Sequence, residues 1–165
     1  GSQGAVAINK LVRAAAPAWF DLGAYVVHLT GKNDPDENSL QHPNYIPMAF
    51  SDNMAGLLQR ANLAIGRSGA GTITELAFTS TPAILIPYPY AAEDHQTYNA
   101  KELVDAGAAV VYQQSELTPE ILEEQVSLWL KSPELLTQMA AKAQNLAVTD
   151  SAKRLANIVR GLTSK

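Results

Sequence analysis

The 165-residue sequence contains no cysteine. Disulfide bonds, thiolate metal sites and a cysteine nucleophile are therefore excluded, and the composition fits a reducing compartment. No apolar run approaches the ~20 residues that a helix needs to cross a bilayer. The sequence also has no Lys- or Arg-rich run, and its net charge is −4. Because nucleic-acid-binding domains usually carry a basic patch, we expect no nucleic acid as the main partner.

Histidine is also scarce, and its placement does not suggest a metal site. His28, His42 and His95 are scattered along the chain, without an acidic partner at the spacing of metal ligands. We therefore expect neither a metal nor another cofactor. His28 lies in an apolar run, where a hydrogen-bonded core histidine is the simpler interpretation.

Apolar residues, in contrast, make up 47% of the chain, against 17% charged residues. This composition supports a full hydrophobic core, and the length suits a single domain, residues 1–165. Apolar and β-branched runs predict five strands, at residues 24–30, 44–50, 63–66, 83–87 and 108–112. Helical spacing predicts helices at residues 5–15, 54–61, 73–78, 93–105, 119–130, 133–143 and 150–159, with Pro17 at the end of the first.

The alternation of helices with solidly apolar strands predicts the fold class. Such strands are typical of a sheet that is buried on both faces. The expected fold is therefore α/β, a doubly wound Rossmann-like parallel sheet flanked by helices. In that architecture ligands bind at the carboxyl ends of the strands, where glycine-rich turns lead into helices.

One such turn is the segment 67–75, Arg-Ser-Gly-Ala-Gly-Thr-Ile-Thr-Glu, between a predicted strand and a predicted helix. Gly69 and Gly71 permit backbone angles closed to other residues and a close approach of a ligand. The first N–H groups of the helix, at the positive end of its dipole, would seat a phosphate. Glu75, one turn further, could accept hydrogen bonds from a ribose diol. The alternative is that Ser68 or Thr72 only caps the helix and that Glu75 is solvated.

A second turn of this kind is Gly1-Ser2-Gln3-Gly4, at the start of the sequence. It would normally follow a strand, and the first strand of a doubly wound sheet is usually central. Three explanations stay open for the missing strand. The first is that the chain is cut at the motif, and the second is that upstream residues supply the strand. The third is that Gly1-Ser2 is partly a cloning remnant.

Five segments in order carry a resemblance to a known family. They are Gly1–Gly4, Phe50-Ser51-Asp52-Asn53-Met54, the turn 67–75, Pro82–Pro87, and Asp94-His95-Gln96 with Asn99-Ala100. Together they resemble the C-terminal domain of the MurG-type peptidoglycan N-acetylglucosaminyltransferases of glycosyltransferase family 28. The resemblance covers nearly the whole chain, and it implies one half of a two-domain glycosyltransferase of the GT-B fold.

The resemblance also implies a site for the donor UDP-N-acetylglucosamine. Ser2 would contact the donor diphosphate, and Ser51 would lie at the uracil. Within the turn 67–75, which includes Ser68 and Gly69, the N–H groups of three residues would bind the diphosphate, namely Ala70, Gly71 and Thr72.

Three further side chains complete the implied donor site. Glu75 would bind the ribose hydroxyls, and His95 and Gln96 would bind the sugar hydroxyls. The sequence departs from the family pattern at Gly71 and Ser51, where bulkier or apolar residues are common. Asp94 and His95 could instead form an acid–base pair, but sequence neighbours at a helix start do not face each other.

The implied function is an inverting, metal-independent transfer of N-acetylglucosamine to a lipid-linked acceptor in cell-wall precursor synthesis. The missing N-terminal domain would bind this acceptor, and the whole protein would be cytoplasmic and peripheral to the inner face of the membrane. We expect no catalytic residue in this chain, which alone should be inactive. One alternative is a donor-binding subunit of a split two-chain transferase with a membrane-bound partner. Another UDP-sugar-using GT-B enzyme, or an epimerase that shares the fold, is a weaker alternative.

Overall fold

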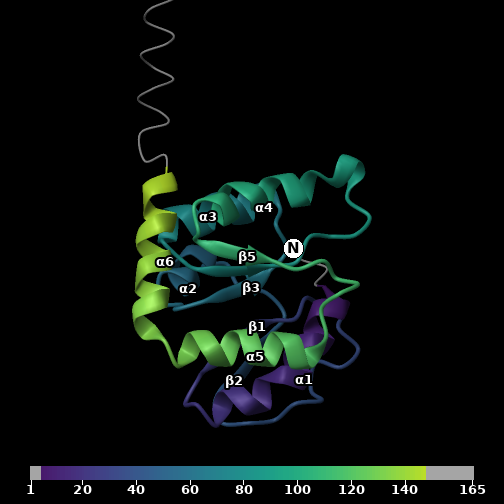
Figure 1. Ribbon diagram of the computed structural model, residues 1–165. Helices are drawn as coiled ribbons and strands as arrows, with labels where there is room; N and C mark the ends of the chain where they lie inside the picture. The colour runs from purple at the N-terminus through teal and green to yellow at the C-terminus, as the bar shows by residue number, and fades with distance from the viewer. Residues whose placement is uncertain (1–4, 148–165) are drawn as a thin grey trace, which may run out of the picture.

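The computed structural model describes residues 5–147, and Figure 1 shows its three-stranded sheet lying between two layers of helices. This part of the chain contains five strands, β1 Val26–Leu29, β2 Tyr45–Met48, β3 Ala64–Gly66, β4 Ala83–Leu85 and β5 Ala109–Val111. The helices are α1 Val6–Phe20, α2 Met54–Leu58, α3 Ala70–Thr79, α4 His95–Asp105, α5 Pro119–Leu130 and α6 Pro133–Leu146, with a short 3-10 turn η1 Ala92–Asp94. The predicted α/β class, with parallel strands flanked by helices, is confirmed. The helix predicted at 150–159 lies outside the described residues.

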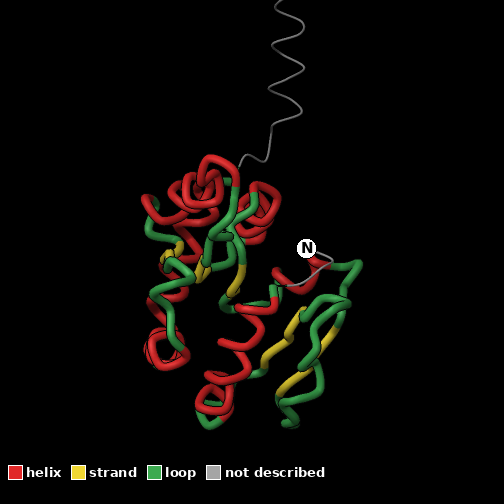
Figure 2. Tube along the Cα trace, turned by 90° about the vertical axis from the view of Figure 1, so that its right-hand side faces the viewer, coloured by secondary structure: helices red, strands yellow, loops and turns green. Residues whose placement is uncertain are grey.

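The strands pair in parallel, but they form two ladders instead of one. β1 pairs with β2, and β4 pairs with both β3 and β5. Figure 2 shows the strands in these two groups. Doubly wound sheets commonly have the strand order 3-2-1-4-5-6, in which strand 1 is central. If β1 to β5 are numbered as strands 2 to 6 of this order, strand 1 would lie between β1 and β3. Among residues 5–147, β1 and β3 are not paired with each other.

The side chains of β4 explain why helices cover both faces of the three-stranded sheet. Successive residues of a strand point to opposite faces. Ile84 and Ile86 join an apolar cluster with α1 and α5, whereas Ala83 and Leu85 join a second cluster with α3 and α4. All four side chains are at most 1% exposed. This burial on both faces places α1 and α5 below the sheet and α3 and α4 above it in Figure 1.

Local signals in the sequence set most helix boundaries. Thr118 caps α5, because its Oγ1 accepts a hydrogen bond from the N–H of Ile121 at 3.3 Å, and Pro119 takes the first helical position. The predicted start and end of this helix are confirmed. Gly107 follows α4 with φ +73°, a conformation that favours glycine.

Several helix predictions were wrong at their ends, and two of them are instructive. Pro17 does not end α1, which continues to Phe20. The last turn buries Trp19 and Phe20 in the core, and this burial outweighs the backbone hydrogen bond that proline removes. The helix predicted at residues 93–105 begins later than expected. Glu93 and Asp94 have φ of +50° and +53°, so α4 begins at His95 and not at Glu93.

A buried polar network joins α1 to the end of β1. Arg13 donates to both carboxylate oxygens of Asp34, at 2.6 and 3.1 Å, and Asn9 donates to Asp34 at 2.7 Å and to the carbonyl of Thr30 at 2.7 Å. The guanidinium beside Asp34 holds the pKa of this carboxyl below its usual range. Because each buried charge is paired and hydrogen-bonded, the network can fix the loop after β1 against the first turns of α1.

His28 completes this network as a neutral core histidine, as predicted. Its Nε2 lies 3.0 Å from Oδ1 of Asn9, which can only accept, and its Nδ1 lies 2.7 Å from the hydroxyl of Tyr45. Nε2 therefore carries the proton, and Nδ1 accepts from the tyrosine. The pKa of His28 is lowered from 6.5 to about 4, mainly by burial and also by the charge of Arg13, while Asp34 opposes the shift.

This pKa predicts a loss of stability on mild acidification. Between pH 6.5 and 4 the unfolded chain binds a proton at His28 that the folded domain does not, so the free energy of unfolding falls as the pH decreases. From pH 7 to pH 5 this fall should be about 1–2 kcal/mol larger in the wild type than in His28→Gln, measured by urea unfolding. His42→Gln, at an exposed histidine, is the control. An equal pH dependence in His28→Gln and wild type would contradict the assignment.

Candidate functional site

The turn after β3 presents unpaired backbone donors. α3 begins at Ala70, and its N-cap is Gly69, which has an extended backbone and no side chain to form a cap hydrogen bond. Within the described residues, the N–H groups of Ala70, Gly71 and Thr72 have no partner, and the first bonded one is that of Ile73, which donates to Gly69. The alternative that Ser68 or Thr72 merely caps this helix is therefore wrong. Three unpaired donors at the positive end of a helix dipole, here named the anion seat, have the geometry expected of an anion-binding site.

Ser68 lies two residues before Ala70, the first residue of α3. It is fully buried, and its Oγ has no hydrogen-bond partner among the described residues. Its carbonyl oxygen accepts a hydrogen bond from Nδ2 of Asn99 on α4 at 3.1 Å. The turn is thus fastened to α4, which also carries His95 and Gln96.

The two glycines of the turn do not use unusual backbone angles, contrary to the sequence-based expectation. Gly69 has φ −62°, and Gly71 lies within the first turn of α3. A Cβ atom at Gly71 would meet nothing within 4 Å, and one at Gly69 would meet only Thr72 Oγ1 at 4.0 Å. What these glycines contribute is open space above the helix start.

Glu75 is exposed on α3, one turn beyond the free N–H groups. No hydrogen bond or ion pair to its carboxylate is recorded among the described residues. Its oxygens are therefore available as acceptors. A carboxylate that accepts from two hydroxyls forms charge-assisted hydrogen bonds.

The start of α4 presents a different set of groups. Nδ1 of His95 lies 2.8 Å from the carbonyl oxygen of Ala92, so Nδ1 carries a proton and Nε2 of the neutral ring can accept a hydrogen bond. Oε1 of Gln96 accepts from the N–H of Tyr88 at 2.9 Å, which leaves its amide group as a donor. The preceding pair of positive φ values, at Glu93 and Asp94, is strained for residues with a side chain.

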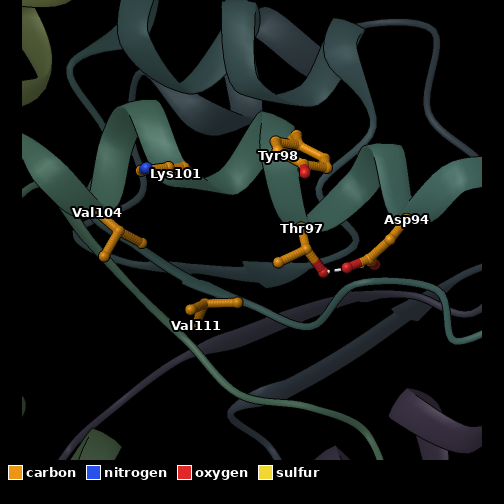
Figure 3. Close-up of a pocket in the computed structure, with 6 residues that line it drawn as sticks. All are labelled: Asp94, Thr97, Tyr98, Lys101, Val104 and Val111. Carbon is orange, nitrogen blue, oxygen red and sulfur yellow. Dashed lines mark hydrogen bonds between the residues drawn. The ribbon is translucent and has the colours of Figure 1, made fainter.

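Asp94 and His95 do not form an acid–base pair. Oδ1 of Asp94 accepts from the hydroxyl of Thr97 at 2.6 Å, whereas His95 bonds to the backbone. Figure 3 shows Asp94 and Thr97 at one end of a hollow of about 300 Å³ between α4 and β5, with Val104 and Val111 at the other. This hollow is mainly apolar and is not the predicted donor site.

Ser51 lies at a second hollow, of about 460 Å³, beside α2. Its Oγ accepts from the N–H of Asn53, and Oδ1 of Asn53 caps α2 by accepting from Gly56. The predicted cap is confirmed, although α2 ends at Leu58. Ser2 lies outside the described residues.

Sequence reasoning assigned no role to four residues that tie the site together. They are Arg67, Tyr88, Asn99 and Gln114. Arg67 donates to Gln114 Oε1 at 2.6 Å and to two backbone carbonyls. Arg67 and Asn99 both lie in the family-like segments, but their neighbours in space are 19 to 47 residues away in the sequence.

The metal prediction took no account of Asp34-Pro35-Asp36, which has Asp-x-Asp spacing. Asp34 is buried against Arg13 and Asn9, and Asp36 lies 3.9 Å from both Arg13 and Lys10. Within residues 5–147, no group of three or more His, Asp or Glu residues lies together as metal ligands would. In the same part of the chain, no helix has the length and apolar character to cross a membrane.

Comparison with known families decides the classification. The family model described as glycosyltransferase family 28 C-terminal domain matches residues 1–155. The chain belongs to this family. The resemblance inferred from the five sequence segments is therefore confirmed, and residues 148–155, which are not described, fall within the match.

Relatives of known name agree with family 28. The chain is 63% identical over 161 residues to the UDP-N-acetylglucosamine--N-acetylmuramyl-(pentapeptide) pyrophosphoryl-undecaprenol N-acetylglucosamine transferase of Rippkaea orientalis, covering 98% of this chain and 46% of that one. It is 62% identical over 165 residues to the enzyme of the same name from a Nostoc species, covering 100% of this chain and 46% of that one. The chain thus spans about half the length of the curated relatives it matches.

Solved structures show the same fold. MurG of Acinetobacter baumannii superposes with a TM-score of 0.81 at 34% identity, covering 98% of this chain and 48% of that one. The glycosyltransferase VinC, solved in complex with dTDP, has a TM-score of 0.69 at 20% identity, over 95% of this chain and 40% of its own. At that identity, the likeness to VinC shows the fold alone.

The backbone geometry predicts opposite effects of alanine at two glycines, Gly71 in the turn 67–75 and Gly107 after α4. Gly71→Ala should raise the free energy of unfolding by about 0.5–1 kcal/mol, because Gly71 is helical and a Cβ has free space. Gly107→Ala should lower it, because Gly107 has φ +73°, a conformation that is strained for a residue with a Cβ. Urea unfolding measures both. Destabilisation by Gly71→Ala would show that the turn needs a conformation that only glycine supplies.

Proposed function

We propose that this chain is the donor-binding half of an inverting glycosyltransferase that uses UDP-N-acetylglucosamine. The observation that carries the proposal is the set of three unpaired N–H groups at Ala70, Gly71 and Thr72, at the carboxyl end of β3. When the sugar leaves the donor, negative charge grows on the UDP diphosphate. Preorganised N–H donors at a helix start stabilise such charge without a proton transfer.

The other parts of the donor are assigned to the side chains around this seat. Glu75, exposed one turn further along α3, accepts from the ribose hydroxyls. His95 Nε2 accepts from a sugar hydroxyl, and the Gln96 amide donates to another. The backbone at Ser51 contacts the uracil. Together with Ser2 at the first turn, these residues bind the donor without a metal or other cofactor.

The relatives' names support the reaction and the acceptor. Both named relatives are N-acetylglucosamine transferases acting on an undecaprenol-linked substrate, and both are single chains about twice this length. We assign acceptor binding and the reacting acid or base to an N-terminal domain that this chain lacks. The whole protein works in the cytoplasm at the inner face of the membrane. A split two-chain transferase is the alternative, with the same donor site.

The direct test is calorimetric titration of the chain with UDP, UDP-N-acetylglucosamine and NAD. We expect both uridine ligands to bind and NAD to compete poorly. In dinucleotide-binding folds the acidic residue that binds ribose lies about 20 residues beyond the phosphate turn, whereas Glu75 lies within the same helix as the turn. Binding of NAD as tight as that of UDP would contradict the proposal.

Glu75 gives a sharper test. Glu75→Gln should weaken UDP binding about ten- to a hundredfold, because it removes charge-assisted hydrogen bonds to the ribose. The free energy of unfolding should stay unchanged, since Glu75 is exposed. Glu123→Gln, an equal change at an exposed position of α5, is the matched control for binding. Unchanged UDP affinity in Glu75→Gln, or loss of the fold, would show that the ribose assignment is wrong.

The chain alone should bind the donor without transferring the sugar. Its titratable groups at the site, Glu75 and His95, are assigned to the donor, and positioning of two substrates can lower a barrier by roughly 7–11 kcal/mol. Steady turnover of a lipid-linked acceptor by the purified chain would contradict this. Such turnover would require a base among residues assigned here to structure or donor binding.

A further inference from the structure

Arg67 follows β3 directly and connects the three strands of its sheet at their carboxyl edge. Nη1 donates to the carbonyl oxygens of Ile86 and Pro87 beyond β4, at 3.1 and 2.8 Å. Nη2 donates to Oε1 of Gln114, beyond β5, at 2.6 Å. One side chain thus fixes the end of β3 to the segments that leave β4 and β5.

The charge of Arg67 has no opposite partner nearby. The guanidinium is half-buried, and none of the carboxylates in the described part of the chain lies within ion-pair distance of it. Burial lowers the pKa of Arg67, but an arginine stays charged in proteins. Its contacts are neutral oxygens and the ring of Tyr88, whose centroid lies 5.3 Å from the guanidinium carbon. Burial of a charge is costly, so such a residue needs this full set of contacts to stay in place.

The contacts of Arg67 reach Gln96 through Tyr88. The Tyr88 ring lies against the guanidinium, and the Tyr88 N–H donates to Gln96 Oε1 at 2.9 Å. At the other end of the same segment, Asn99 donates to the carbonyl of Ser68 at 3.1 Å. Two adjacent residues of the turn, Arg67 and Ser68, therefore hold both ends of segment 88–99.

We infer that Arg67 is a positioning residue that holds Gln96 in register with the anion seat at the start of α3. The inference rests on the proposed function, because it concerns how the sugar and diphosphate parts of that site are kept together. Arg67 acts through Tyr88 and the backbone of residues 86–88. It sets the extra affinity that the sugar adds to UDP, and not the affinity for UDP itself.

Lysine cannot replace arginine in this arrangement. The planar guanidinium donates to two carbonyls and to Gln114 while it stacks on a ring, whereas an ammonium is a compact point charge that cannot span these partners. Arg67→Lys therefore keeps the positive charge but removes the simultaneous hydrogen bonds to the two carbonyls and to Gln114. Arg67→Gln removes both.

The experiment compares the dissociation constants for UDP and UDP-N-acetylglucosamine in the wild type, Arg67→Lys, Arg67→Gln and Gln114→Ala. In Arg67→Lys the ratio of the two constants should change on the order of tenfold against the sugar nucleotide, the effect of one lost hydrogen bond of about 1.4 kcal/mol. UDP affinity itself should change much less. Gln114→Ala should shift the ratio in the same direction by less. Lys131→Gln, at an exposed residue after α5, controls for the charge lost in Arg67→Gln.

The outcomes separate this inference from the proposed function. If the wild type binds UDP but Arg67→Lys and Gln114→Ala keep the wild-type ratio, the positioning role is wrong and the donor site stands. Equal weakening of UDP and the sugar nucleotide in Arg67→Lys would mean that Arg67 acts on the diphosphate, and would also overturn it. If the wild type binds neither ligand, both proposals fail. Should the Arg67 variants unfold in urea controls, Gln114→Ala decides alone.

Discussion

The structure depends on the burial of β4 on both faces. Its residues Ala83, Ile84 and Leu85, together with Ile86 directly after the strand, are at most 1% exposed and alternate between two apolar clusters. A strand buried in this way needs helices on both sides. The parallel pairing of β4 with β3 and β5 requires crossover connections, which α3 and α4 supply on one face, while α1 and α5 cover the other. All strand-to-helix turns of this sheet then meet at one edge. The position of the anion seat at α3 is a consequence of this arrangement.

At that edge, the chain keeps polar groups free where a ligand can use them. The N–H groups at the start of α3 have no partners among the described residues, and Gly69 and Gly71 leave open space above them. Next to these free groups, Arg67 and Asn99 join the turn to segment 88–99 through the ring of Tyr88 and the carbonyl of Ser68. A rigid frame around unpaired donors is the arrangement expected for stabilising charge that develops on a leaving group.

Much of this fold could be predicted from the sequence, because its signals are local. The apolar run at β4, the Thr118-Pro119 start of α5 and the strand-turn-helix pattern at residue 67 each indicate one element. The family-like segments predicted the donor-site residues, whose ligand contacts remain a prediction. The start of α4 could not be predicted, since a positive φ such as that of Glu93 is uncommon for a glutamate and has no signal in the local sequence.

Other features depend on contacts between distant segments. Pro17 lies inside α1 because Trp19 and Phe20 are buried beyond it, a tertiary effect that outweighs a local rule. The network of Asn9, Arg13 and Asp34 joins residues more than 20 positions apart, so nothing in the local pattern indicated it. The contacts of Arg67 were hidden for the same reason.

The central claim is that the start of α3 binds a diphosphate through its backbone, and amide NMR with UDP tests it most directly. On saturation with UDP, the N–H signals of Ala70, Gly71 and Thr72 should show the largest shifts and exchange more slowly with solvent. Thr97, Tyr98 and Lys101, which line the hollow beside α4, should change little. Unchanged signals at residues 70–72 in a sample that binds UDP, with the shifts gathered at α4 instead, would contradict the account.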